Sequence, residues 1–78
     1  MHEKISYKLS MKEIGKRIRD LRLSKKLSQT QLAELIKTTQ DTVSLWELGK
    51  SYPSIDYVIE LVKVFNVSSD YLLGIKEI

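Results

Sequence analysis

Residues 28–49 read SQTQLAELIKTTQDTVSLWELG, and this stretch decides the fold. Ser28 and Gln31 have the spacing of a capping box, which predicts that a short helix begins after Ser28. Thr39 can cap a second short helix, which Gly49 ends. Because only two or three residues separate the two helices, the turn between them must be sharp. The stretch therefore predicts a helix-turn-helix.

Two longer helices flank this pair in the sequence. Ser10 and Glu13 also have capping-box spacing, and the helix that starts there is expected to fray near residues 24–26. Another helix follows Pro53, where the apolar periodicity is the strongest in the chain. In chain order, the residues expected on the buried sides of the four helices are Met11, Ile14, Ile18 and Leu21; Leu32, Leu35 and Ile36; Val43 and Trp46; and Ile55, Val58, Ile59, Val62 and Phe65.

A fifth helix is expected near the C-terminus. It would begin at a cap on Ser68 or Ser69 and end at Gly74. The alternation typical of β-strands persists nowhere, and 78 residues leave room for one domain. We therefore expect an all-α, compact five-helix domain over residues 10–78, preceded by an arm of residues 1–9 without a pattern and open to disorder.

The composition excludes most enzyme chemistry. The chain has no cysteine, and its single histidine, His2, is next to the N-terminus, so neither a thiolate or histidine metal site nor a catalytic triad can be assembled. We expect no catalytic residue, no metal and no cofactor. No apolar run approaches the roughly 20 residues of a membrane span, and the first residues lack a signal-peptide hydrophobic stretch, so we expect a cytoplasmic protein without membrane contact.

Charge is divided unevenly along the chain. The net charge is +3, but residues 1–26 hold nine Lys or Arg against three acidic residues, whereas residues 27–78 hold four against seven. This asymmetry fits a surface presented to an anionic partner such as nucleic acid, and it equally fits the solvated side of a helix. Charge alone leaves the choice open.

Four motifs in order resemble the Cro/phage-repressor, or xenobiotic response element, family of helix-turn-helix proteins. They are IGKRIR at 14–19, LSQTQLA at 27–33, TQDTVS at 39–44 with WELGK at 46–50, and VSSDYLLG at 67–74. The likeness covers roughly residues 12–74. It implies a lambda-repressor-like domain that binds double-stranded DNA, with the second helix of the helix-turn-helix in the major groove.

The resemblance also implies a role for particular residues. The family positions that read bases are occupied by Gln40, Asp41, Ser44 and Leu45. The family positions that contact phosphates are occupied by Gln29, Thr39, Lys50 and Ser51. Gln29 is also expected to brace the start of the recognition helix. Arg22 and Glu47 occupy positions that form an ion pair between the first helix and the end of the recognition helix.

Some of these positions have a second interpretation. A side-chain amide such as that of Gln40 can pair with adenine, and the carboxylate of Asp41 can accept from cytosine or repel nearby phosphates. Leu45 can touch a thymine methyl group, but Leu45 and Leu48 equally fit partly exposed packing residues. Gly49-Lys50-Ser51 resembles the tail of a nucleotide-binding loop, but the required earlier glycine and strand are missing.

Three features depart from the family pattern. Lys37 replaces the glycine of the turn, so a positive φ there would add strain of about 1 kcal/mol and the turn could be remodelled. Thr38 replaces an apolar residue that seals the turn. The recognition helix has no Arg or Lys before Lys50, so the commonest way of reading guanine is missing from it.

These features predict a sequence-specific DNA-binding transcription regulator, most simply a repressor that binds a palindromic operator as a homodimer. One copy reads too few base pairs for specificity, and two copies would bind half-sites about 34 Å apart. The expected dimer interface consists of Tyr71, Leu72, Ile75 and Ile78, although Tyr71 and Leu72 could equally complete the core. The alternative is an antitoxin or other interaction module that masks a partner protein.

Overall fold

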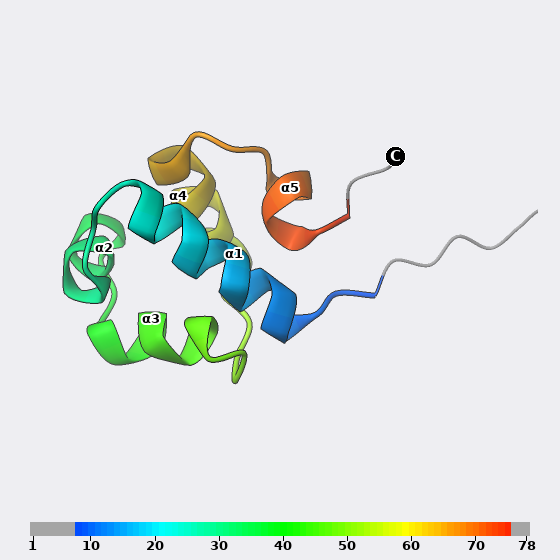
Figure 1. The fold of residues 1–78 in the computed structure, drawn as a ribbon, viewed down its shortest axis with the longest axis horizontal. Coiled ribbons are helices and arrows are strands. Elements are labelled where there is room, and N and C mark those ends of the chain that lie inside the picture. Colours follow the sequence, from blue (N-terminus) through cyan, green and yellow to red (C-terminus); the bar gives the residue numbers. More distant parts are fainter. Residues whose placement is uncertain (1–7, 76–78) are drawn as a thin grey trace, which may run out of the picture.

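The structure, a computed structural model, describes residues 8–75 and contains five α-helices and no strand in that range (Figure 1). The helices are α1 (Met11–Ser24), α2 (Gln29–Ile36), α3 (Gln40–Glu47), α4 (Ile55–Phe65) and α5 (Ser69–Leu73). All five expected helices are present, so the all-α prediction is confirmed. None of the helices in residues 8–75 has the length and apolar character needed to cross a membrane.

The helix N-termini are capped as the residue spacing predicts. In the capping box of α2, the backbone N–H of Gln31 donates to Ser28 Oγ at 3.0 Å, and the N–H of Ser28 donates to Gln31 Oε1 at 2.8 Å. Ser10, Thr39 and Ser68 each accept the backbone N–H three residues later. The first of the two candidate serines therefore caps α5. Because caps depend on local sequence, they fix where α1, α2, α3 and α5 begin.

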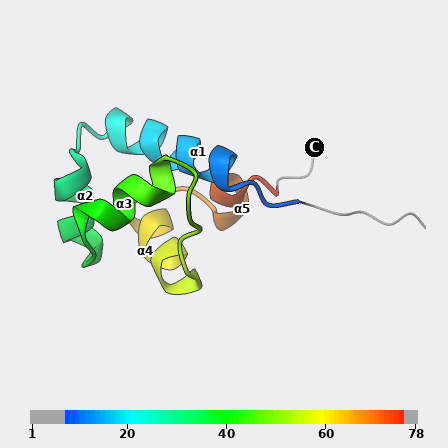
Figure 2. The same ribbon diagram turned by 90° about the horizontal axis from the view of Figure 1, so that it is seen from below.

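The five helices surround one core. In Figure 1, α1 crosses the middle of the molecule, α2 and α5 lie towards its two ends, and α3 lies below it; Figure 2 views the molecule from the side on which α3 lies. Helix α3 packs against α1 and α2, and α4 packs against α2 and α5. The core residues are Ile14, Ile18, Leu32, Ala33, Ile36, Val43, Trp46, Val58, Leu61, Phe65 and Leu72.

Three residues expected in the core are exposed instead. Leu35 of α2 is 55% exposed, and Ile55 and Ile59 of α4 are 70% and 46% exposed. The strip of α4 that faces the core is centred on Leu61, which sequence reasoning omitted. Apolar residues surround much of α4, so their spacing alone fits more than one inward strip, and packing against α2 and α5 decides which strip is buried.

Helices α1 and α3 come into backbone contact at Gly15. A β-carbon at this position would lie 2.0 Å from the carbonyl oxygen of Trp46, closer than two unbonded atoms can approach. In the sequence Gly15 stands out only as part of the IGKRIR motif at 14–19. Its missing side chain is what allows α3 to lie directly on α1.

The turn between α2 and α3 keeps its shape despite its unusual residues. Lys37 adopts the left-handed conformation with φ of 63°, so the backbone keeps the glycine-like geometry and the turn is not remodelled. The N–H of Thr38 donates to the carbonyl of Ala33 at 2.9 Å, which closes the end of α2. The expected strain at Lys37 therefore stays local, at about 1 kcal/mol.

One residue assigned to the dimer interface belongs to the core. Leu72 is 0% exposed and packs within the central cluster, so it offers no surface to a second copy. This corrects its assignment, because α5 turns Leu72 inward against the other helices. Tyr71 is 40% exposed and Ile75 is half-buried, whereas Ile78 lies outside the described residues.

Candidate nucleic-acid interface

Helix α3 has one side in the core and one side facing solvent. Val43 and Trp46 are buried at 0% and 2% exposure, and the Trp46 ring packs against Tyr57 of α4 with the ring centres 5.4 Å apart. Of the predicted base-reading residues, Gln40, Asp41 and Leu45 are exposed and Ser44 is half-buried. The structure therefore presents all four of these side chains along the outer part of one helix.

A bidentate ion pair fixes the C-terminal end of α3 to α1. Arg22 Nε donates to Glu47 Oε2 at 2.6 Å, and Arg22 Nη2 donates to Glu47 Oε1 at 2.9 Å. Arg22 Nη1 also donates to the carbonyl of Leu27 at 2.9 Å. The two side chains are only 10% and 4% exposed. The predicted ion pair is present, and it also holds the segment between α1 and α2.

The charge of Arg22 is secure in this environment. Its hydrogen bond to Glu47 raises the pKa of the guanidinium above the usual value, and this outweighs the opposite effect of burial. The guanidinium therefore stays protonated at every pH near neutrality. The pair gives a fixed connection between the helices, insensitive to titration of Arg22.

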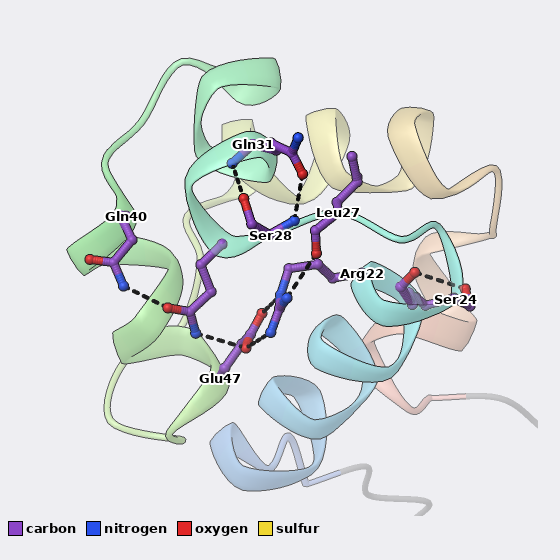
Figure 3. Close-up of polar contacts among 9 residues, drawn as sticks. Arg22, Ser24, Leu27, Ser28, Gln31, Gln40 and Glu47 are labelled. Atoms are coloured by element: carbon purple, nitrogen blue, oxygen red, sulfur yellow. Dashed lines mark hydrogen bonds and ion pairs between the residues drawn. The ribbon is translucent and has the colours of Figure 1, made fainter.

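Gln29 connects the ion pair to the start of α3. Its Nε2 donates to Glu47 Oε1 at 3.0 Å, and its Oε1 accepts from Gln40 Nε2 at 2.6 Å. Figure 3 labels the two outer residues of this connection, Gln40 and Glu47. A continuous row of hydrogen bonds therefore runs from Gln40 through Gln29 and Glu47 to Arg22. Because the amide nitrogen of Gln40 donates to Gln29, its Oε1 can face outward as a ready acceptor. The bracing expected of Gln29 is present in the structure.

Three of the four predicted phosphate-contact residues lie beside the ends of α3, and the fourth, Gln29, begins α2. Thr39 and Lys50 are exposed, and Ser51 is half-buried in the loop after the helix. The backbone N–H of Lys50 donates to the carbonyl of Leu45 at 2.9 Å, so it closes α3 and cannot reach a phosphate at the same time. A contact from Lys50 must therefore come from its side-chain ammonium. The hydroxyl of Thr39 already accepts the N–H of Thr42.

The arrangement offers little for metal chemistry. Within residues 8–75, His, Cys, Asp and Glu side chains form no group of three that could hold a metal ion. The polar groups around α3 are amides, hydroxyls, ammonium or guanidinium groups and the carboxylates of Asp41 and Glu47, of which Glu47 is paired with Arg22. The amides, hydroxyls and cations suit hydrogen bonding to bases and phosphates.

Comparison with known proteins assigns the family. A family model described as helix-turn-helix matches residues 18–72, which is most of the chain. The chain belongs to the Cro/phage-repressor family of helix-turn-helix proteins. It is 36% identical over 66 residues to the HTH-type transcriptional activator BcrR of Enterococcus faecalis, a match over 85% of this chain and 32% of BcrR. This chain covers between about a third and just over half of the length of the curated relatives that it matches.

Solved structures of the family have the same fold. The P22 c2 repressor, solved in complex with a synthetic operator, matches with a TM-score of 0.74 and 32% identity, over 77% of this chain and 91% of the repressor. The lambda-repressor-like fold is thereby confirmed. Hydroxypropylphosphonic acid epoxidase from S. wedmorenis also matches, with a TM-score of 0.75, 24% identity and coverage of 86% of this chain and 36% of the epoxidase. At that identity the likeness shows the fold alone.

Proposed function

We propose that this helix-turn-helix protein is a sequence-specific DNA-binding transcription regulator that inserts α3 into the major groove. The observation that carries the proposal is the outward edge of α3, presented to solvent on a helix whose inner side is fixed by Gly15, Trp46 and the Arg22–Glu47 pair. A helix that reads bases must be both exposed and rigid, because a flexible segment loses binding free energy when it becomes ordered on the DNA. The family relationship supports the same assignment.

The polar residues divide into readers and positioning contacts. Gln40, Asp41, Ser44 and Leu45 would meet base edges, with the amide of Gln40 paired to adenine while Gln29 keeps it in place. The side chains of Gln29, Thr39, Lys50 and Ser51 would meet phosphates on either side of the groove. Since α3 has no basic residue of its own, we expect a consensus that leans towards A·T at the base-contacting positions.

Repression is the simplest regulatory outcome, because the bound protein needs only to cover a promoter. BcrR, one of the relatives, is an activator, so the direction of regulation is a separate question from DNA binding. Two copies of the domain on a palindromic operator would supply the specificity that one α3 cannot.

Selection of bound duplexes from a random pool, followed by sequencing, tests the proposed function. We expect a palindromic consensus with half-sites about 34 Å, or one helical turn, apart. Affinity for the selected duplex should fall steeply with salt, with about −0.9 in the log–log slope for each phosphate contacted. Failure to enrich any sequence, together with a flat salt profile, would favour the alternative of an interaction module that masks a protein.

The dimer contact can be tested separately. Tyr71 and Ile75 are the remaining described residues of the proposed interface, at the C-terminal end of the fold. Ile75→Lys should lower the number of protein copies bound to the selected duplex from two towards one, because the substitution places a charge in an apolar contact. Sedimentation of the protein–DNA complex measures this number. Ile55→Lys is the matched control, since Ile55 is an exposed apolar residue on α4. If the control rather than Ile75→Lys separates the copies, the interface lies on α4.

A further inference from the structure

A stripe of cations on α1 lies beside the recognition helix. Lys12, Lys16 and Arg19 are spaced four and three residues apart, so they follow one another along one side of α1 over about 10 Å. All three side chains are exposed. The direct contact between α1 and α3 at Gly15 brings this stripe to the flank of α3.

The stripe lines a groove between α1 and α3. One hollow of about 350 Å³ is lined by Lys12, Glu13, Lys16, Arg19, Glu47 and Leu48. An adjoining hollow of about 410 Å³ shares Arg19, Glu47 and Leu48 with the first. Its other lining residues are Arg22, Gln29 and Ser44. The groove therefore runs from the start of α1 to two of the residues proposed to meet DNA, Gln29 and Ser44.

The groove has a surplus of positive charge, because its lining holds four cations, Lys12, Lys16, Arg19 and Arg22, against two carboxylates, Glu13 and Glu47. Both carboxylate oxygens of Glu47 are already bonded to Arg22, and Gln29 donates to one of them as well. Lys16 forms only an exposed, 3.8 Å pair with Asp20, in which the two side chains are 69% and 64% exposed. Such an exposed ion pair contributes little free energy, so the ammonium of Lys16 can leave Asp20 and bind an anion that attracts it more strongly.

The stripe continues into the loop after α3. A β-carbon on Gly49 would lie 3.0 Å from the Cα of Lys12, so the start of α1 and this loop are in contact. Lys50 is the next residue of the loop. The loop that carries Lys50 therefore lies next to the start of α1, where Lys12 is located.

We propose that Lys12, Lys16 and Arg19 form a phosphate-binding surface that holds one DNA strand along the α1–α3 groove while α3 reads the bases. The inference rests on the proposed function and adds residues that the helix-turn-helix itself does not supply. The side chains reach outward from α1, beside α3 and not on it, so they meet the sugar-phosphate backbone and not the base edges. They supply the positive charge that α3 lacks before Lys50.

The test compares two variants of equal charge. Lys16→Gln with Arg19→Gln removes two cations from the groove, and Lys25→Gln with Lys63→Gln removes two from the end of α1 and from α4. Binding is measured for the full chain on a duplex selected from a random pool and on an unrelated duplex, each between 50 and 300 mM salt. Thermal unfolding followed by circular dichroism checks that both variants remain folded at the temperature of the assay.

The groove variant should weaken binding to both duplexes by the same factor, at least about ten-fold near 0.1 M salt, and should reduce the salt slope by about 1.8 relative to the control. An unchanged slope would overturn the inference, as would a slope reduced equally by the control. A change in the ratio of the two affinities would also overturn it, since Arg19 would then read a base.

The result separates this inference from the proposed function. If the unmodified chain binds neither duplex, both fall. If Lys50→Ala weakens binding while the groove variant does not, the domain binds DNA without using the α1 stripe, and only this inference falls.

Discussion

The two sides of α3 differ in how much of their chemistry is already satisfied. On the inner side, Trp46 is buried and Glu47 has hydrogen bonds to both oxygens. On the outer side, Asp41 and Leu45 are exposed to solvent. The inner side thus fixes where the helix lies, and the outer side leaves groups for a partner.

Gln40 belongs to both sides. Its amide nitrogen donates to Gln29, which is itself bonded to the buried Glu47, while its backbone starts the exposed edge of α3. The inner side of α3 is bonded and packed, whereas its outer side is exposed. Substitutions on the inner side should therefore mainly lower the free energy of unfolding, and substitutions on the outer side should mainly change DNA binding.

The largest effect is expected at Arg22. Arg22→Leu leaves the Glu47 carboxylate, whose side chain is 4% exposed, without its cation and should lower the free energy of unfolding by ~3–5 kcal/mol. Urea denaturation measures this. The double variant Arg22→Leu with Glu47→Leu should recover part of the loss, because no buried charge is then left unpaired. A loss below about 1 kcal/mol in the single variant would mean that the pair does not anchor α3.

The next effect is expected at Gly15. Alanine normally stabilises an exposed helix position relative to glycine by about 0.5–1 kcal/mol. Here its β-carbon would meet the Trp46 carbonyl, so Gly15→Ala should instead destabilise the fold by about 1–3 kcal/mol. The exposed neighbour Lys16 provides the control, since Lys16→Ala should change stability by no more than about 0.5 kcal/mol. A stabilised Gly15→Ala variant would show that α1 and α3 are less closely packed.

On the outer side, Gln40→Ala should cost about 1–3 kcal/mol on the selected duplex and change the preferred base at one position. Its unfolding free energy should change little, because Gln40 is exposed. Competition binding against single-base variants of the duplex measures the preference. Equal losses of binding free energy on the selected and the unrelated duplex would show that Gln40 does not read a base.

The smallest effect is expected at Lys50. Lys50→Ala should weaken binding to all sequences alike and reduce the salt slope by about 0.9, the value for one phosphate. A salt titration on two unrelated duplexes measures it. A loss confined to one duplex would make Lys50 a base reader.

Features governed by neighbouring residues were predictable from the sequence. Ser28 and Thr39 cap the helices that they were expected to cap, and Gly49 follows the end of α3 with φ of 72°. The pairing of Arg22 with Glu47 was also predictable, although only because the motifs resemble a known family. Periodicity was less reliable in α4, where Ile55 was expected inside and is exposed.

The sequence by itself determined the five helices, their caps and the order of chemical groups along α3, because these depend on residues within a few positions of each other. Only the tertiary structure decided that Leu72 is in the core, that Gly15 lies against Trp46 and that the cations of α1 flank α3. Those facts depend on which helix faces meet. Packing of residues far apart in the chain sets these contacts, and no local pattern contains them.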